Sequence, residues 1–317
     1  MPVEAVVVNR NTSSLLEDCL ESIRKQDYPG RITVWVVDNA SSDDSVRMVL
    51  DRFPEANLFW NRANTGYAAA CNRGAQMSGE PCLLIMNADT VLSPGTISTL
   101  ARFLEENPSC GAVGPRVLNT DGTLQYSCRE FPSLAGAFMH AFFGLFLPDN
   151  RYSRDYLKKD WDHCSCREVD WVSGAFMAVR RQAFQQVGGF DEGYHMYVED
   201  VDLCWRLREA GWTVDYVSGG DVVHHIGQSC RLASTRMTFH HHRSMLRFHF
   251  RTYRGPARLP VSALVAAGLG ARLVLIAALN LVHGIRARPG GSRRQLMPGS
   301  YQPGGRGNGP TGAGGKV

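Results

Sequence analysis

The strongest constraint on the fold is an alternation along residues 3–115, where short apolar runs alternate with stretches whose apolar residues recur at helical spacing. Short apolar runs predict strands and amphipathic stretches predict helices. The strands are expected at residues 3–8, 33–37, 58–60 and 82–86, and the helices at 15–27, 43–53 and 66–76. Because strands that alternate with helices build parallel βαβ units, we expect an α/β fold with a Rossmann-like, mostly parallel central sheet and flanking helices.

The second half of the chain is less regular. Periodicity fades over residues 129–166, which contain Pro132 and Pro148, so this stretch predicts an acceptor-facing insertion of long loops or short helices. Strands are then predicted at residues 169–173, 175–179 and 213–217, and helices from Gln182, at 201–210 and at 235–253.

Length and charge limit the number of domains and the class of partner. A chain of 317 residues with 44% hydrophobic residues builds one large domain or two small ones, which excludes a disordered or fibrous protein. Much of the small net charge of +4 comes from basic residues between positions 286 and 317. A nucleic-acid partner is therefore not expected, because its footprint would spread basic residues over the fold.

The cysteines and the N-terminal residues indicate the compartment. The nine cysteines are scattered, and the chain begins Met1–Glu4 without a basic region followed by an apolar one. Secreted domains of this kind carry paired cysteines and a leader of that composition. We therefore expect a reducing, cytoplasmic location.

An apolar stretch near the C-terminus, residues 261–285, carries Arg272 near its middle. An arginine at the centre of a bilayer costs about 2.5–3.5 kcal/mol even on lenient insertion scales. We therefore expect an amphipathic helix that lies on a membrane surface or packs on the domain, rather than one that spans. The Gly-, Pro- and Arg-rich tail at 287–317 predicts disorder.

Polar residues follow each of the first strands, at positions 9–11, 38–43, 64–66 and 87–89. In open parallel sheets ligands bind beyond the carboxyl ends of the strands, so these residues are the first candidates for a site. Asp38 either accepts the ring N–H of a pyrimidine base or only caps the following helix. Asn39 and Ser41 are expected to cap that helix.

Two interpretations of Asp89 stay open on spacing alone. It follows the most apolar strand of the chain, so its carboxylate lies at the mouth of the predicted sheet. There it either holds a divalent cation on a diphosphate or caps a helix that begins near Pro94. The first fits because Mg²⁺ and Mn²⁺ take one or two protein carboxylates together with phosphate oxygens and water.

Three carboxylates, Glu199, Asp200 and Asp202, lie within four residues ahead of a helical pattern. They repel one another unless a helix N-terminus, a cation or a proton relieves them. Asp202 is expected in the first helical turn. Glu199 and Asp200 are expected before that turn, facing a cleft, where a carboxylate can take a proton from an attacking hydroxyl.

Histidines and two thiols complete the candidates. His224 and His225 end an apolar run, and alternation lets only one of them complete an oxygen-rich metal site. Residues 240–242 are three histidines that predict a basic, phosphate-facing surface. Cys164 and Cys166 lack a second pair at zinc spacing, so a structural zinc is disfavoured.

Taken together, these motifs resemble an inverting family 2 glycosyltransferase of the GT-A fold, most closely the rhamnosyltransferase branch. The matching pieces are VVVN at 6–9, VVDNASSD at 36–43, NTGYAAACNRG at 64–74, NAD at 87–89, WVSGAF at 171–176, VGGFDE at 187–192, YVEDVDL at 197–203 and HH at 224–225. Arg10 stands where an aromatic residue is common. Asn87 replaces the first carboxylate of the usual D-x-D, as it does in the rhamnosyltransferase branch.

The resemblance implies a role for each matching residue. Asp38 would contact the nucleobase, Asp89 and His224 would bind Mg²⁺ or Mn²⁺, Asp200 would be the general base, and Glu199 would orient the acceptor. The remaining implied nucleotide-sugar contacts are Asn9, Asn39, Asn64, Gly66, Asn72 and Asn87, and the remaining acceptor contacts are Trp171 and Gly174.

The same resemblance implies the substrates: dTDP-L-rhamnose as donor and a glycan or polyprenyl-diphosphate-linked sugar as acceptor, at the cytoplasmic membrane face. A peripheral membrane contact through residues 243–285 suits such an acceptor, because cations attract an anionic leaflet. The alternatives are another donor such as a UDP-linked hexose, a catalytically silent sugar-nucleotide-binding protein and, least favoured, a nucleotidyltransferase. The oligomeric state stays open between monomer and homodimer.

The order of the motifs indicates a single catalytic domain, because residues from both halves must meet in one cleft. We expect a glycosyltransferase domain at 1–255, with a nucleotide-binding half at 1–116 and an acceptor and catalytic half at 117–255. A helical extension is expected at 256–286, followed by the tail.

Overall fold

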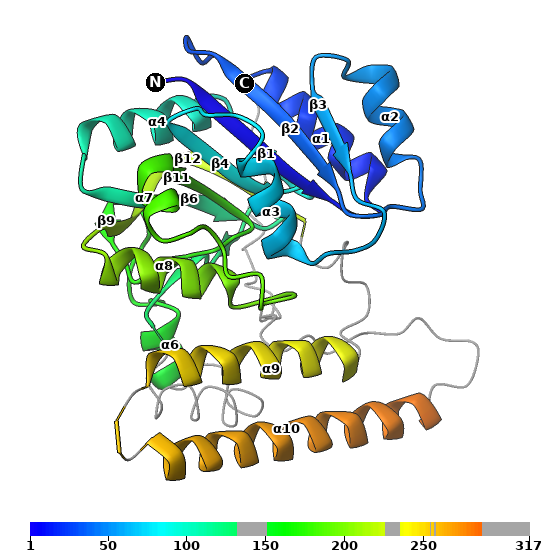
Figure 1. Cartoon of the computed structure of the whole chain (residues 1–317), viewed down its shortest axis with the longest axis vertical. Coiled ribbons are helices and arrows are strands. Elements are labelled where there is room, and N and C mark those ends of the chain that lie inside the picture. The colour runs from blue at the N-terminus through cyan, green and yellow to red at the C-terminus, as the bar shows by residue number, and fades with distance from the viewer. Residues whose placement is uncertain (132–150, 226–234, 254, 257, 287–317) are drawn as a thin grey trace, which may run out of the picture.

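A computed structural model of the chain describes residues 1–131, 151–225, 235–253, 255–256 and 258–286 (Figure 1). The predicted tail at 287–317 and much of the predicted insertion lie outside these residues. The expected division into domains stays a prediction.

A central sheet forms the body of the molecule. Its strand order is β3-β2-β1-β4-β11-β6-β12-β5, with β7 added to β6 and β9 to β12, and a separate pair joins β8 to β10. The strands are β1 (Val3–Asn9), β2 (Ile32–Asp38), β3 (Asn57–Trp60), β4 (Cys82–Asn87), β5 (Thr90–Leu92), β6 (Cys110–Leu118), β7 (Leu124–Gln125), β8 (Cys128–Arg129), β9 (Arg167–Glu168), β10 (Trp171–Val172), β11 (Phe176–Arg180) and β12 (Thr213–His224). The first four along the order are parallel, whereas β11 runs antiparallel to β4 and β6.

Helices cover both faces of this sheet (Figure 1). They are α1 (Ser13–Arg24), α2 (Ser45–Arg52), α3 (Tyr67–Ala75), α4 (Thr96–Glu106), α6 (Arg151–Tyr156), α7 (Arg181–Gln186), α8 (Glu199–Glu209), α9 (Thr235–Thr252) and α10 (Arg258–Arg286). The expected strands and helices of residues 3–115 all form, within a few residues of their predicted ends.

The sheet separates two hydrophobic clusters, because successive side chains of a strand point to opposite faces. Val7 and Leu84 pack in one cluster with residues of α1, α2 and α4. Val6 and Leu83 pack in the other with residues of α3, α7 and α8. Strands that are buried on both faces have continuous apolar sequences. This is why β1, β2 and β4 could be predicted from the sequence.

Two long helices, α9 and α10, lie side by side below the sheet (Figure 1). The polar contacts between them come from α10 side chains that face α9: Ser262 lies 3.0 Å from His249 Nε2, and Arg272 lies 2.8 Å from His242 Nε2. The outward side of α10 is apolar instead, with Leu264 73% exposed and Val274 69% exposed. Arg272 is therefore accommodated within the helix pair and is 8% exposed.

Length and composition make α10 a candidate membrane span over Arg258–Ala278, with a mean hydropathy of 2.1 and 11% of its residues buried.

The prediction of a basic surface at residues 240–242 is wrong in part. Burial, together with neighbouring cationic groups, lowers the pKa of His241 and of His242 to about 4, so both are neutral at pH 7. Helical spacing alone does not show which side chains of α9 are buried against neighbouring elements.

Candidate active site

Buried polar side chains meet where β1 and β2 end. The Asn9 amide donates to Asp38 Oδ2 at 2.8 Å and to Ser41 Oγ at 3.2 Å, and Asp38 Oδ1 accepts the Ser41 backbone N–H at 2.9 Å. Asp38 is 1% exposed, and each of its oxygens keeps a lone pair for a further donor. Helix α2 begins at Ser45 after Asp44, so the alternative that Asp38 caps this helix is wrong.

The Asn39 side chain holds the loop between β3 and α3. Its Nδ2 donates to Asn64 Oδ1 at 2.9 Å and to the Gly66 carbonyl at 3.1 Å, and its Oδ1 accepts the Thr65 N–H at 2.9 Å. The prediction that Asn39 and Ser41 cap α2 is therefore wrong. Both side chains instead join loops at the carboxyl edge of the sheet.

Gly66 and Asn72 join α3 to the segment 190–195. Gly66 has φ +89°, and a Cβ there would lie 2.7 Å from the His195 carbonyl oxygen, so the close approach needs glycine. The Asn72 side chain donates to the Phe190 carbonyl and accepts the Phe190 N–H, both at 2.9 Å, and also donates to Glu192 at 3.0 Å. Asn72, predicted as a nucleotide contact, thus uses both amide donors within the protein.

Asp89 meets His224 across the pairing of β5 with β12. Thr90 pairs with His224, and His224 Nε2 lies 3.2 Å from Asp89 Oδ1. The opposite ring nitrogen, Nδ1, lies 2.8 Å from Gln125 Oε1 on β7. Helix α4 begins at Thr96 after Gly95 and has no side-chain cap, so the alternative that Asp89 caps it is wrong.

The contact with Gln125 orients the ring of His224. When Nδ1 donates to the Gln125 oxygen, Nε2 is the ring nitrogen that is left to bind a metal beside Asp89. His225 contributes its backbone N–H to the Asp89 carbonyl at 2.9 Å, and the His224 ring is the one that faces the carboxylate. Among the described residues no group of three or more His, Cys, Asp and Glu is arranged to hold a metal.

Glu199 and Asp200 open helix α8. We predicted both residues ahead of the helix; this is wrong, because α8 begins at Glu199 and they form its first turn with Asp202. Asp200 Oδ2 accepts the Gly174 N–H at 2.8 Å, and Oδ1 accepts the Val201 N–H at 2.9 Å. The helix N-terminus relieves part of the repulsion among the three carboxylates.

The environments of the two adjacent carboxyl groups differ. Burial and then the nearby Asp200 charge raise the pKa of Glu199, whose Oε2 is buried without a hydrogen-bond partner among the described residues. Burial also raises the pKa of Asp200, against its backbone N–H bonds, which favour the ionised form. Two such neighbouring groups favour a proton on Glu199 and the negative charge on Asp200.

Tyr67 and Ala175 connect the two halves of the site. The Tyr67 hydroxyl donates to the Gly174 carbonyl at 2.5 Å, and the Asn87 N–H donates to the Ala175 carbonyl at 2.9 Å. Gly174 has little room, since a Cβ there would lie 3.2 Å from Asp200 Cβ. The residues predicted for the donor at Asn87 and for the acceptor at Gly174 therefore share one edge of the sheet.

Other candidates lie elsewhere or were missed. Trp171, predicted to contact the acceptor, is 6% exposed and donates its indole N–H to the Glu130 carbonyl at 3.0 Å. Cys164 and Cys166 are free thiols at the surface. Tyr67 lies inside a motif that we recognised and could have been found, whereas Gln125 carries no sequence signal because only the pairing of β7 with β6 brings it to the site.

Comparison with known proteins gives two family matches. The model described as glycosyl transferase family 2 matches residues 4–188, and one described as the N-terminal domain of galactosyltransferase matches residues 162–229.

Two similar proteins are rhamnosyltransferases. The chain is 38% identical over 242 residues to N-acetylglucosaminyl-diphospho-decaprenol L-rhamnosyltransferase of Mycobacterium tuberculosis, covering 72% of this chain and 78% of that protein. It is 28% identical over 167 residues to rhamnosyltransferase WbbL of Escherichia coli strain K12, covering 52% and 60%.

Two solved structures are similar in fold. Mannosyltransferase PcManGT from Pyrobaculum calidifontis, in complex with GDP-Man and Mn²⁺, matches with a TM-score of 0.55 and 18% identity over 90% of this chain and 79% of that one. GalNAc-T7 with UDP, GalNAc and Mn²⁺ matches with a TM-score of 0.57 and 14% identity over 89% and 57%. These likenesses confirm the predicted fold class.

Proposed function

Because this chain belongs to glycosyltransferase family 2, we propose that it transfers an L-rhamnosyl group from a nucleotide-linked donor to a sugar carried on a lipid diphosphate. The chain is a glycosyltransferase, and the choice of rhamnose and of the acceptor rests on its similarity to the 38% identical rhamnosyltransferase of Mycobacterium tuberculosis. The observation that carries the chemistry is the Asp200 carboxylate, held by two backbone N–H groups beside the buried carboxyl group of Glu199.

The donor nucleotide is assigned to the edge formed by β1, β2 and the loop after β3. Asp38 keeps a free lone pair on each oxygen and accepts the ring N–H of the base. Asn9 holds that carboxylate in place, and Asn39 holds the loop that contains Asn64 and Gly66. These residues fix the donor by orientation, which is a large part of the catalytic advantage in a group transfer.

Asp89 and His224 would hold the divalent cation. Their donor set fits Mg²⁺ or Mn²⁺, because a carboxylate oxygen and an imidazole nitrogen converge with the ring oriented by Gln125. Two protein ligands leave the remaining positions to diphosphate oxygens and water, which is usual for these ions. When bound, the cation stabilises the negative charge that grows on the leaving diphosphate.

Asp200 is assigned as the general base. It accepts the proton of the acceptor hydroxyl while that oxygen attacks the anomeric carbon from the face opposite the diphosphate. The new glycosidic C–O bond forms as the bond to the diphosphate breaks, and the electron pair leaves with the diphosphate, so the configuration inverts. Glu199 stays protonated beside it and donates a hydrogen bond that orients the acceptor.

The pair of helices α9 and α10 is assigned to peripheral contact with an anionic membrane, where a lipid-linked acceptor is found. Ser262 and Arg272 of α10 face α9, whereas Leu259, Leu264 and Val274 of α10 are exposed at 77%, 73% and 69%. An outward apolar side suits the boundary between headgroups and acyl chains. The exposed Arg243 on α9 adds electrostatic attraction to the leaflet.

The donor is tested by metal-dependent thermal stabilisation with a panel of nucleotide sugars. A ligand at 100 times its dissociation constant adds about 2.7 kcal/mol to the free energy of unfolding. We expect a shift with dTDP-L-rhamnose and Mn²⁺ that is larger than with UDP-linked hexoses. A shift with a UDP-linked hexose alone would contradict rhamnose, and no shift with any nucleotide sugar would contradict donor binding.

A further inference from the structure

Helix α9 contacts the segment 191–197 along its length. Arg247 and Arg251 pair with Asp191, and Ser244 Oγ donates to the Met196 carbonyl at 3.0 Å. The rings of His195 and His240 lie 5.4 Å apart, and those of Tyr197 and His241 lie 5.3 Å apart. This segment leads directly into Glu199 and Asp200.

The backbone of this segment is strained where it enters α8. Tyr197 has φ 66° and Val198 has φ 71°, and both are residues that disfavour the left-handed region. Such conformations persist only when the surrounding structure fixes them. Val198 directly precedes Glu199. The contacts that hold this bend therefore determine the direction of the Glu199 and Asp200 side chains.

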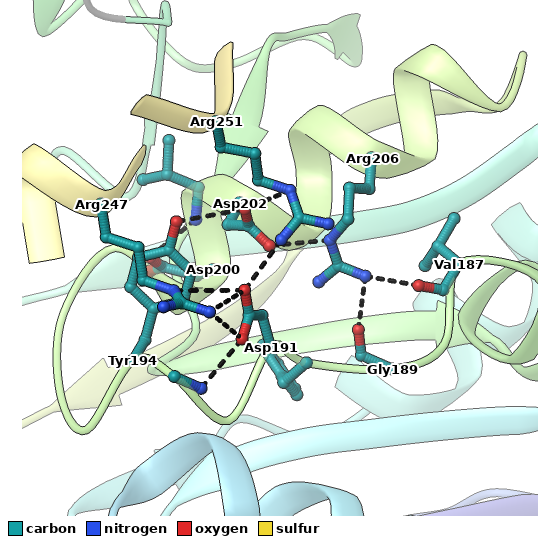
Figure 2. A network of polar contacts seen from close by, with 12 residues as sticks. Val187, Gly189, Asp191, Tyr194, Asp200, Asp202, Arg206, Arg247 and Arg251 are labelled. Carbon is teal, nitrogen blue, oxygen red and sulfur yellow. Dashed lines mark hydrogen bonds and ion pairs between the residues drawn. The ribbon is translucent and has the colours of Figure 1, made fainter. Parts of the chain in front are cut away.

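Arg251 connects the segment to α8. Its Nη1 lies 2.8 Å from Asp191 Oδ2, and its Nε lies 3.3 Å from Asp202 Oδ1 (Figure 2). Asp202 is fully buried on the first turn of α8 and also pairs with Arg206 at 2.7 Å and with the Tyr194 hydroxyl at 3.2 Å. One guanidinium therefore bridges the two ends of the strained bend.

Arg247 holds the same bend from the preceding turn of α9. It contacts both Asp191 carboxylate oxygens at 2.9 Å, and its guanidinium lies 5.3 Å from the centre of the Tyr194 ring (Figure 2). It also fills the space beside Gly193, where a Cβ would lie 2.2 Å from both Cζ and Nη2 of Arg247. Asp191 thus receives two arginines from one face of α9.

We propose that Asp191, Arg247 and Arg251 are positioning residues for the glycosyl transfer, which fix the bend at 197–198 and thereby the direction of the Glu199 and Asp200 side chains. This rests on the proposed function of the pair. None of the three is assigned a contact with substrate. Their effect passes through the backbone of residues 191–198 and through Asp202, so it falls on the chemical step rather than on donor binding.

The test is Arg251→Gln, compared with Arg251→Lys and with Arg208→Gln as a matched control. Arg251 is suitable because its removal leaves Asp191 with Arg247 and Asp202 with Arg206, so the variant keeps a partner for each carboxylate. Arg208 lies at the other end of α8 and pairs with Glu168 at 2.9 Å on the surface.

We expect Arg251→Gln to lower kcat by about tenfold to a hundredfold, the cost of a misplaced catalytic group. We expect the donor KM of this variant to be unchanged. Each kcat is calculated per donor-binding site, so that misfolded protein does not lower it. Arg208→Gln is expected to retain the parent kcat. Arg251→Lys recovers part of the loss, because a single ammonium replaces one of the two contacts. An unchanged kcat per site, or an equal loss in Arg208→Gln, would overturn the inference.

A double-mutant cycle with Asp191→Asn separates this network from general destabilisation. If Asp191 and Arg251 act as a unit, the double variant loses no more kcat than the more affected single variant. Strictly additive losses would count against the proposal. Failure of the proposed function can be distinguished from failure of this inference, because the parent enzyme itself would then transfer no sugar.

Discussion

At the scale of single residues, the buried carboxyl group of Glu199 lies next to the half-buried Asp200, an arrangement that costs stability. Burial raises the pKa of Glu199, so the native protein binds its proton more tightly than the unfolded chain does. Stability is therefore fully present below the ordinary glutamate pKa of 4.5 and falls as pH rises from there towards the raised native value.

We expect Glu199→Gln to be more stable than the parent at pH 7, by about 1–3 kcal/mol, since one pKa unit corresponds to 1.36 kcal/mol. The gain shrinks as pH falls from 7 towards 4.5 and is absent below 4.5, where the parent carboxyl group is protonated in both states. Thermal unfolding across this pH range measures it. Glu209→Gln, an exposed glutamate at the end of α8, is the control and stays near the parent at every pH. A Glu199→Gln variant less stable at pH 7 would contradict the assignment.

Gln125 is the second residue with a specific expectation. It orients the His224 ring without being a metal ligand itself, and loss of such a partner typically weakens metal binding by about tenfold to a hundredfold. Titration of Gln125→Ala with Mn²⁺ in the presence of donor is expected to give that loss. The exposed Gln182→Ala serves as the control. Parent-like Mn²⁺ affinity in Gln125→Ala would remove the support for His224 as a ligand.

At the scale of elements, the sequence predicted the helices and strands that local periodicity determines, and the sheet edge at which parallel strands end. Asp38 and Asp89 follow apolar strands, and parallel pairing brings their ends to one edge. The beginning of α8 was missed because the strained bend at Val198 leaves no mark in the hydrophobic pattern. The pairing of His224 with Asp89 needed the long-range contact of β12 with β5, which no local pattern specifies.

The proposed membrane contact of helices α9 and α10 can be tested by changing the exposed apolar side of α10. Leu264→Glu combined with Val274→Glu places two charges on the outward side of α10, where both parent side chains are exposed, so folding is retained. Flotation with anionic liposomes is expected to recover the parent and to leave this variant in the soluble fraction. Leu50→Glu, at a 59% exposed apolar position on α2, is the control. Equal flotation of the double variant would contradict membrane contact through α10.

At the scale of the whole molecule, residues from distant parts of the chain form one site. The Tyr67 hydroxyl bonds to Gly174, and the Gly174 N–H bonds to Asp200, so a short path of hydrogen bonds joins α3 to α8. The predicted halves at 1–116 and 117–255 stay a prediction as boundaries. The family motifs indicated this convergence, but the contacts that produce it depend on tertiary packing.

The most direct test is transfer of L-rhamnose from dTDP-L-rhamnose to polyprenyl-diphosphate-linked N-acetylglucosamine, with Mn²⁺, by the parent and by Asp200→Asn. Donor affinity is measured on the same preparations. We expect transfer by the parent and, for Asp200→Asn, a loss of about 10²–10⁴ in kcat with unchanged donor affinity, because a general base has been removed. Turnover of Asp200→Asn at the parent rate would contradict this expectation.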